Sequence, residues 1–66
     1  MELKDVMKER RKLLRITQLD LAEMAEISLA TVKDIERGKG NPSLSTVHRI
    51  LEVLGMEIEY RIRKTV

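Results

Sequence analysis

The side chains that could bind a ligand in this sequence are basic groups and amides rather than nucleophiles or metal ligands. The chain has one His and no Cys, so a thiolate zinc site and a Cys–His catalytic pair are both excluded. The segment RGKGN, residues 37–41, lacks the spacing of a phosphate-binding P-loop. His48 has no catalytic partner in the pattern and is expected at the surface. The sequence therefore predicts no catalytic residue, no cofactor and no metal, and an enzyme is a poor interpretation.

Positive charge is concentrated at two places, although 13 Lys and Arg nearly balance 11 Asp and Glu over the 66 residues. Arg37 and Lys39 lie in a Gly-rich turn. The other group is Lys8, Arg10, Arg11, Lys12 and Arg15. Local basic patches on a domain of modest net charge favour contact with a polyanion such as a nucleic acid. The alternative is a solvated helix face, and charge alone does not decide between the two.

The hydrophobic pattern predicts four short helices that position these side chains. Apolar residues recur at steps of three and four from Glu2 to about Arg15, as in an amphipathic helix. Thr17, with Asp20 three residues later, is a variant of the capping box and begins a second helix that ends near Ala25. The core is expected to be aliphatic, because one residue of the chain is aromatic, and Met7 and Met24 are expected to fill gaps in it.

Two serines predict the starts of the remaining two helices. Ser28 caps a helix that runs through Glu36, and Gly38 and the pair Asn41–Pro42 prevent its continuation. Ser43 caps a fourth helix, which Gly55 ends. Its apolar stripe is formed by Leu44, Val47, Ile50, Leu51 and Leu54.

The final segment, GMEIEYRIRK, alternates apolar and charged residues, which is typical of a half-buried strand. No other segment is a candidate partner strand, so we expect antiparallel pairing with a second copy of the chain. With the two-fold axis at Tyr60, Glu57 faces Arg63 and Glu59 faces Arg61, so each of these four charges meets its opposite. The sequence thus predicts a C2 dimer joined by residues 56–64. The predicted interface residues are Met56, Glu57, Ile58, Glu59, Tyr60, Arg61, Ile62 and Arg63.

The second and third helices are joined too closely to lie antiparallel, which indicates a helix-turn-helix. Ala22 is small at the expected helix crossing, and Val32 anchors the third helix. The stretch ITQLDLAEMAEISLATVKDIERGKGNPSL resembles the phage-repressor/Cro-like (XRE) family in its TQ..LA, IERGK and NPSL motifs. The resemblance covers about residues 3–55. It implies a mainly α fold, with a lambda-repressor-like helix-turn-helix domain over residues 1–55 and the dimerisation strand after it.

The resemblance also implies which residues contact double-stranded DNA. The third helix would enter the major groove, with residues 29, 30 and 34 at base edges. Gln18 would bind a phosphate, since a glutamine at the first helical position has little structural use. Arg37, Lys39 and Asn41 would bind the DNA backbone on the other side, and the expected base partner of Asp34 is a cytosine amino group. The expected DNA-binding residues are Thr17, Gln18, Ser28, Leu29, Ala30, Thr31, Lys33, Asp34, Arg37, Lys39 and Asn41. In this family an Arg of the first helix pairs with the Glu that ends the third, so Arg11 and Glu36 are expected to form a structural pair.

Three positions depart from the usual family pattern. Glu26 replaces the glycine of the turn, where a left-handed backbone costs a non-glycine residue about 1 kcal/mol. Leu29 and Ala30 can contact thymine methyl groups but cannot hydrogen-bond to bases through their side chains. Part of the sequence discrimination is therefore expected to come from DNA shape and phosphate contacts. Because of these residues an alternative function remains open, a protein-interaction module that has kept the fold but no longer reads bases.

The leading interpretation is a sequence-specific transcriptional regulator, a dimeric repressor of a palindromic operator. A repressor domain that ends in an intersubunit strand is similar to HipB-type antitoxins, which implies a toxin as a further partner. An antitoxin and a stand-alone regulator both remain open. No segment has the length of a membrane span and no signal peptide is visible, so the expected location is the cytoplasm.

Overall fold

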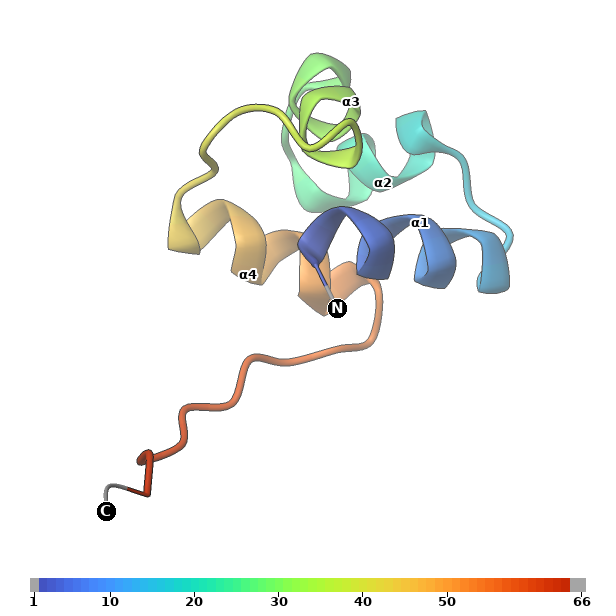
Figure 1. Cartoon of the computed structure of the whole chain (residues 1–66). Helices are drawn as coiled ribbons and strands as arrows, with labels where there is room; N and C mark the ends of the chain where they lie inside the picture. Colours follow the sequence, from blue (N-terminus) through green and yellow to red (C-terminus); the bar gives the residue numbers. More distant parts are fainter. Residues whose placement is uncertain (1, 65–66) are drawn as a thin grey trace.

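The computed structural model describes residues 2–64, and its folded part consists of four α-helices (Figure 1). They are α1, Leu3–Leu13; α2, Gln18–Ala25; α3, Leu29–Glu36; and α4, Leu44–Val53. The predicted mainly α fold with these four helices is confirmed. Helix α1 ends two residues before the predicted limit, because Arg15 adopts a left-handed backbone with φ of 58°. None of the helices within residues 2–64 is long and apolar enough to cross a membrane.

Side-chain caps determine where three of the helices begin. The Thr17 hydroxyl accepts a hydrogen bond from the Asp20 N–H at 3.0 Å, and the Asp20 carboxylate accepts one from the Thr17 N–H at 2.8 Å. These hydrogen bonds favour the ionised carboxylate and lower the pKa of Asp20. Ser28 and Ser43 each accept a hydrogen bond from the N–H three residues later. The predicted starts of α2, α3 and α4 are therefore confirmed.

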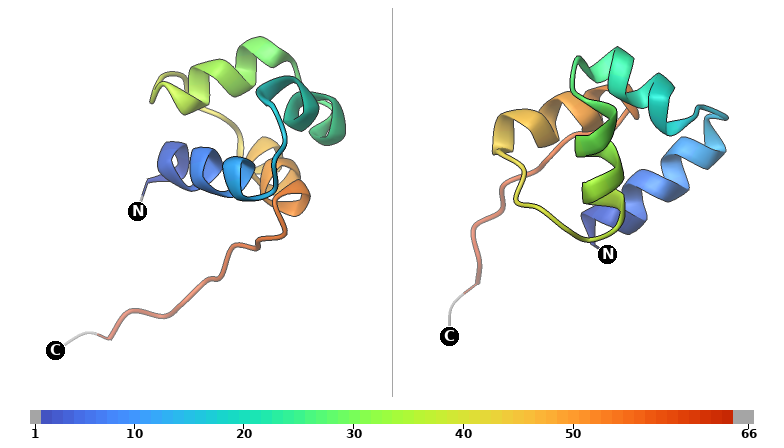
Figure 2. Two further views of the ribbon diagram at one scale, coloured as in Figure 1. Left: turned by 90° about the vertical axis from the view of Figure 1, so that its right-hand side faces the viewer. Right: turned by 90° about the horizontal axis from the view of Figure 1, so that it is seen from above.

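The core lies where α2 packs against α3 and α4 and where α1 packs against α3 (Figure 2). Ala22 and Ala25 are buried in α2, and their small side chains allow the helices to approach closely. Met7 is fully buried, as expected, but Met24 is 60% exposed and does not fill the core. The buried apolar cluster consists of Met7, Leu21, Ala22, Ala25, Val32, Ile35, Ile50 and Leu54.

The turn between α2 and α3 contains the left-handed residue expected at Glu26, with φ of 58° and ψ of 44°. The next residue, Ile27, donates its N–H to the Ala22 carbonyl at 3.0 Å, which closes the end of α2. Only two residues, Ile27 and Ser28, then separate this turn from α3. This short connection sets α3 across α2 and forms the helix-turn-helix.

Residues 56–64 extend away from the helices without forming a helix or a strand (Figure 1). From Ile58 onward the apolar side chains become more exposed: Ile58 is half-buried, Tyr60 is 75% exposed and Ile62 is 99% exposed. Residues 2–64 contain no β-ladder, so the extended shape agrees with the period-2 pattern but is not a strand in the single chain. The predicted pairing with a second copy stays a prediction.

Candidate nucleic-acid interface

Helix α3 is anchored on one side and free on the other. Val32 and Ile35 are buried in the core, whereas Ala30 and Lys33 are exposed and Thr31 is half-buried. Seen from above, α3 lies over the other helices with its outer side uncovered (Figure 2, right). An α-helix of this kind fits the width of the major groove of B-DNA.

Leu29 differs from the other expected base-contacting residues of α3. Its side chain is half-buried and packs against the core cluster. Part of the side chain therefore stabilises the start of α3, and the remainder is available to a ligand. Ala30, directly after it, is exposed and presents its methyl group to solvent.

Glu36 is buried at 2% exposure and receives hydrogen bonds from two helices. Arg11 of α1 donates from Nε to Glu36 Oε2 at 2.9 Å and from Nη2 to Oε1 at 3.0 Å. Arg11 Nη1 also donates to the Ile16 carbonyl at 3.3 Å. The hydrogen bonds to Glu36 raise the pKa of Arg11. This is the pair expected from the family resemblance, and it ties the end of α3 to α1.

Gln18 takes part in the same network, which the sequence did not indicate. Its Nε2 donates to Glu36 Oε1 at 3.1 Å. The expectation that a glutamine at the start of α2 has little structural use was wrong, since this contact joins α2 to the end of α3. A phosphate contact by Gln18 would have to use the same side-chain amide that binds Glu36.

Asp34 and Arg37 form an ion pair one helical turn apart at the end of α3. Asp34 was expected to contact a cytosine amino group and Arg37 the DNA backbone, with no contact between the two. Their spacing of three residues was the signal that could have revealed the pair. The pair reduces the repulsion between Asp34 and phosphates, and it holds the Arg37 side chain near the outer side of α3.

The loop after α3 brings its polar residues next to that helix. The Lys39 N–H donates to the Asp34 carbonyl at 2.8 Å, and Gly38 and Gly40 both have positive φ. A shallow hollow lies between the loop and α3. It is lined by Thr31, Asp34, Ile35, Lys39, Gly40, Asn41 and Pro42. Side chains from α3 and from the loop, which were assigned separately to bases and to phosphates, therefore meet at one surface.

Two of the expected contact residues, Thr17 and Ser28, also cap helices. The Thr17 hydroxyl accepts from Asp20, and the Ser28 hydroxyl accepts from the Thr31 N–H at 3.0 Å. The Ser28 and Thr31 hydroxyls are also hydrogen-bonded to each other at 2.7 Å. Thr17 and Ser28 are exposed, so each hydroxyl can cap its helix and still face a ligand.

Comparison with known proteins places these features in a family. Residues 7–61 match the model of a family described as helix-turn-helix. The chain is similar to the immunity repressor protein of Bacillus phage phi105, at 41% identity over 56 residues. That match covers 85% of this chain and 36% of the phage protein, so the chain spans about a third of that repressor.

Two archaeal proteins are similar over most of their own length. An uncharacterized HTH-type transcriptional regulator of Methanothermobacter thermautotrophicus is 38% identical over 55 residues, which is 83% of this chain and 80% of that protein. Another from Methanocaldococcus jannaschii is 39% identical over 57 residues, 86% of each chain. The family match covers the turn at Glu26 and the whole of α2, α3 and α4. The chain thus belongs to the XRE-type helix-turn-helix family of DNA-binding transcriptional regulators.

Proposed function

We propose that this protein is a cytoplasmic, dimeric repressor that recognises an inverted-repeat operator through α3. The observation that carries the proposal is the surface shared by α3 and the following loop. There Thr31 and Asp34 of the helix line the same hollow as Lys39 and Asn41 of the loop. A helix inserted in the major groove would bring the first pair toward base edges and the second toward the phosphates beside the groove.

Direct reading of bases by this surface rests on a small set of side chains. Ala30 and the exposed part of Leu29 offer apolar contact to thymine methyl groups, and Asp34 offers an acceptor to a cytosine amino group. Asp34 shares its carboxylate with Arg37, which weakens its use as an acceptor. We therefore propose that phosphate contacts and DNA shape contribute a large share of affinity and selectivity.

The composition of residues 56–64 supports the proposed dimer. In the antiparallel register centred on Tyr60, Ile62 of one copy lies opposite Ile58 of the other. Ile58 lines a hollow beside α4 together with His48, Leu51, Glu52, Met56 and Glu57. An Ile62 side chain that is 99% exposed in the single chain would thus gain apolar contacts beside the partner's α4.

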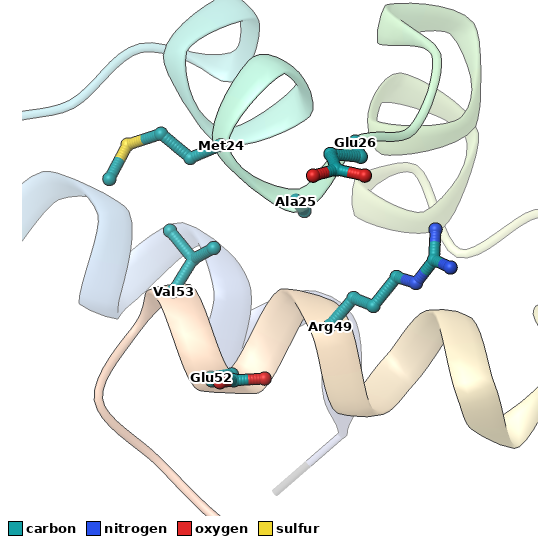
Figure 3. A pocket seen from close by; sticks show the side chains of 6 residues that line it. All are labelled: Met24, Ala25, Glu26, Arg49, Glu52 and Val53. Atoms are coloured by element: carbon teal, nitrogen blue, oxygen red, sulfur yellow. The ribbon is translucent and has the colours of Figure 1, made fainter.

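A second candidate function, binding of another protein as in an antitoxin, is favoured by a different surface. A hollow at the end of α2 is lined by Met24, Ala25, Glu26, Arg49, Glu52 and Val53 (Figure 3). The exposed Met24 and half-buried Val53 supply apolar contact area. Glu26 lies at the end of α2 on one side of the hollow, and Arg49 extends from α4 on the other. This surface does not depend on the outer side of α3, so protein binding and DNA binding could coexist.

Replacing Lys39 tests the DNA-binding proposal. Lys39→Gln should weaken binding to all duplexes by a similar factor and make the slope of log K against log salt shallower by about one unit per bound copy. The reason is that one phosphate contact per copy is lost. Fluorescence anisotropy with a labelled duplex at several salt concentrations measures both quantities. Lys39→Arg is the matched control, because it retains the charge and should retain the slope. Equal slopes for all three proteins would contradict the assignment.

A further inference from the structure

Two neighbouring arginines of α1 bind the C-terminal ends of two different helices. Arg11 binds Glu36, the last residue of α3. Arg10 donates from Nε at 3.1 Å and from Nη2 at 2.9 Å to the carbonyl oxygen of Leu54, the C-cap of α4. Successive residues point in directions about 100° apart around a helix with 3.6 residues per turn, so adjacent side chains can reach different elements. Helix α1 thereby connects the end of α3 to the point where residues 56–64 leave the domain.

The contact of Arg10 lies where the C-terminal segment takes its direction. Leu54 is followed by Gly55, whose φ is +72°. A Cβ atom at Gly55 would lie 3.4 Å from Arg10 Nη2, so the guanidinium lies directly against this turn. The Met56 N–H then donates to the Leu51 carbonyl at 2.8 Å. The backbone from Leu54 to Met56 is therefore held both by its own hydrogen bonds and by α1.

We propose that Arg10, acting with Arg11, sets the spacing between the two half-sites that the dimer accepts on DNA. The inference rests on the proposed dimer, in which residues 56–64 of two copies pair. In such a dimer the distance between the two α3 helices depends on the angle at which each segment leaves its domain. A change in that angle acts once in each copy, and two-fold symmetry doubles its effect on the separation of the helices. The separation must match about 34 Å, or a multiple of it, for both helices to enter major grooves on one side of the duplex.

Arg10 is therefore a positioning residue that need not touch DNA. Its loss should free the exit of the segment and leave α3, with its own contacts to Arg11, in place. The expected signature is a change in spacing preference without a change in half-site sequence. A residue that only stabilised the fold would instead lower affinity at every spacing by the same factor.

The experiment uses the full chain with a series of inverted repeats whose half-sites are separated by different numbers of base pairs. The half-site is the one that the wild type selects from random duplexes. We expect the wild type to prefer one spacing by at least about tenfold. Arg10→Met should bind a single half-site within about twofold of wild type, and its preference among spacings should fall to about threefold or less.

Two further variants make the result decisive. Arg10→Gln removes the two-donor contact while retaining a polar end, and it substitutes for Arg10→Met if that protein does not fold by circular dichroism. Lys12→Ala is the matched control, because Lys12 is an exposed cation of the same helix and should leave the spacing preference unchanged.

The outcomes separate this inference from the function on which it rests. If the wild type recovers no inverted repeat, the dimeric operator itself is wrong, and the role of Arg10 falls with it. If the wild type prefers one spacing and both Arg10 variants keep that preference, the inference alone is overturned. Uniform weakening of both variants at every spacing would also overturn it, because that result marks Arg10 as merely structural.

Discussion

At the scale of single residues, the contacts that decide the geometry converge on Glu36. It is a buried charged side chain with Arg11 and Gln18 as hydrogen-bond donors, and it ends the helix proposed to read DNA. A buried carboxylate is costly unless its oxygens are paired, so each donor stabilises both the charge and the position of α3. Arg11 and Gln18 thus keep α3 at a fixed angle to α1 and α2.

Replacing Arg11 should therefore destabilise the fold more than it weakens DNA contacts. Arg11→Met leaves the Glu36 carboxylate buried with one donor, and breaking a buried pair costs about 3–5 kcal/mol. Because the Arg11 side chain retains some exposure, we expect the free energy of unfolding to fall by about 2–3 kcal/mol. Urea denaturation followed by circular dichroism measures the loss. Lys12→Met, on the exposed side of α1, should change the midpoint little. An unchanged midpoint for Arg11→Met would show that the pair does not stabilise the fold.

The Arg11–Glu36 pair was predicted from the family resemblance and not from the sequence pattern. Three other contacts were not predicted. Gln18 reaches Glu36 and Arg10 reaches Leu54 across 18 and 44 positions of sequence, and no local periodicity reports such contacts. The pairing of Asp34 with Arg37 was visible as a three-residue spacing. For Leu29, the family resemblance placed the side chain at base edges, but a residue at the edge of the apolar stripe can also pack inward.

At the scale of elements, caps made the helix boundaries predictable. Ser and Thr before α2, α3 and α4 supply the oxygen that the first free N–H groups need, and a glycine follows α3 and α4 closely. The end of α1 was misplaced because Arg15, not a glycine, adopts the left-handed backbone there. Residue type alone gives no signal for such a turn.

The other non-glycine residue with positive φ, Glu26, gives a prediction for the helix-turn-helix itself. Glu26→Gly should stabilise the protein by about 1 kcal/mol, because glycine adopts φ of 58° without the steric cost of a Cβ atom. That gain corresponds to a rise in Tm of about 4–8 °C for a domain of this size. Thermal denaturation measures it. Glu26→Ala is the control, since it removes the carboxylate but keeps the Cβ atom. Its Tm should not rise as much as that of Glu26→Gly. A Tm for Glu26→Gly at or below that of wild type would mean that the Glu26 side chain contributes more than its strain costs.

At the scale of the whole molecule, residues 56–64 expose apolar side chains to solvent in the single chain. Tyr60 and Ile62 are largely exposed, and at every second position of the segment stands a charged residue, first acidic and then basic, in the order Glu57, Glu59, Arg61, Arg63. Antiparallel pairing about Tyr60 would cover the first pair and match every charge in the second set. The sequence predicted the extended shape of this segment from its period of two. Its partner cannot be derived from contacts within one chain.

Tyr60→Pro tests the paired segment. Proline has no N–H to donate to a ladder and restricts the residue before it, so this variant should dimerise at least about tenfold more weakly. Its helices should be unaffected, because Tyr60 lies outside all four. Sedimentation equilibrium at micromolar protein measures the dissociation constant. Tyr60→Val keeps a strand-forming residue and serves as control. If Tyr60→Pro sediments as the wild type does, another surface holds the dimer.

The central claim is that two copies of this chain read an inverted repeat through α3. Its most direct measurement is selection from random duplex DNA on the purified protein, followed by sequencing of the retained molecules. We expect an inverted repeat whose half-sites lie about one helical turn, or a multiple of it, apart. Retention of no common motif by protein with normal helical content would contradict the account and favour a helix-turn-helix that binds protein instead of reading DNA.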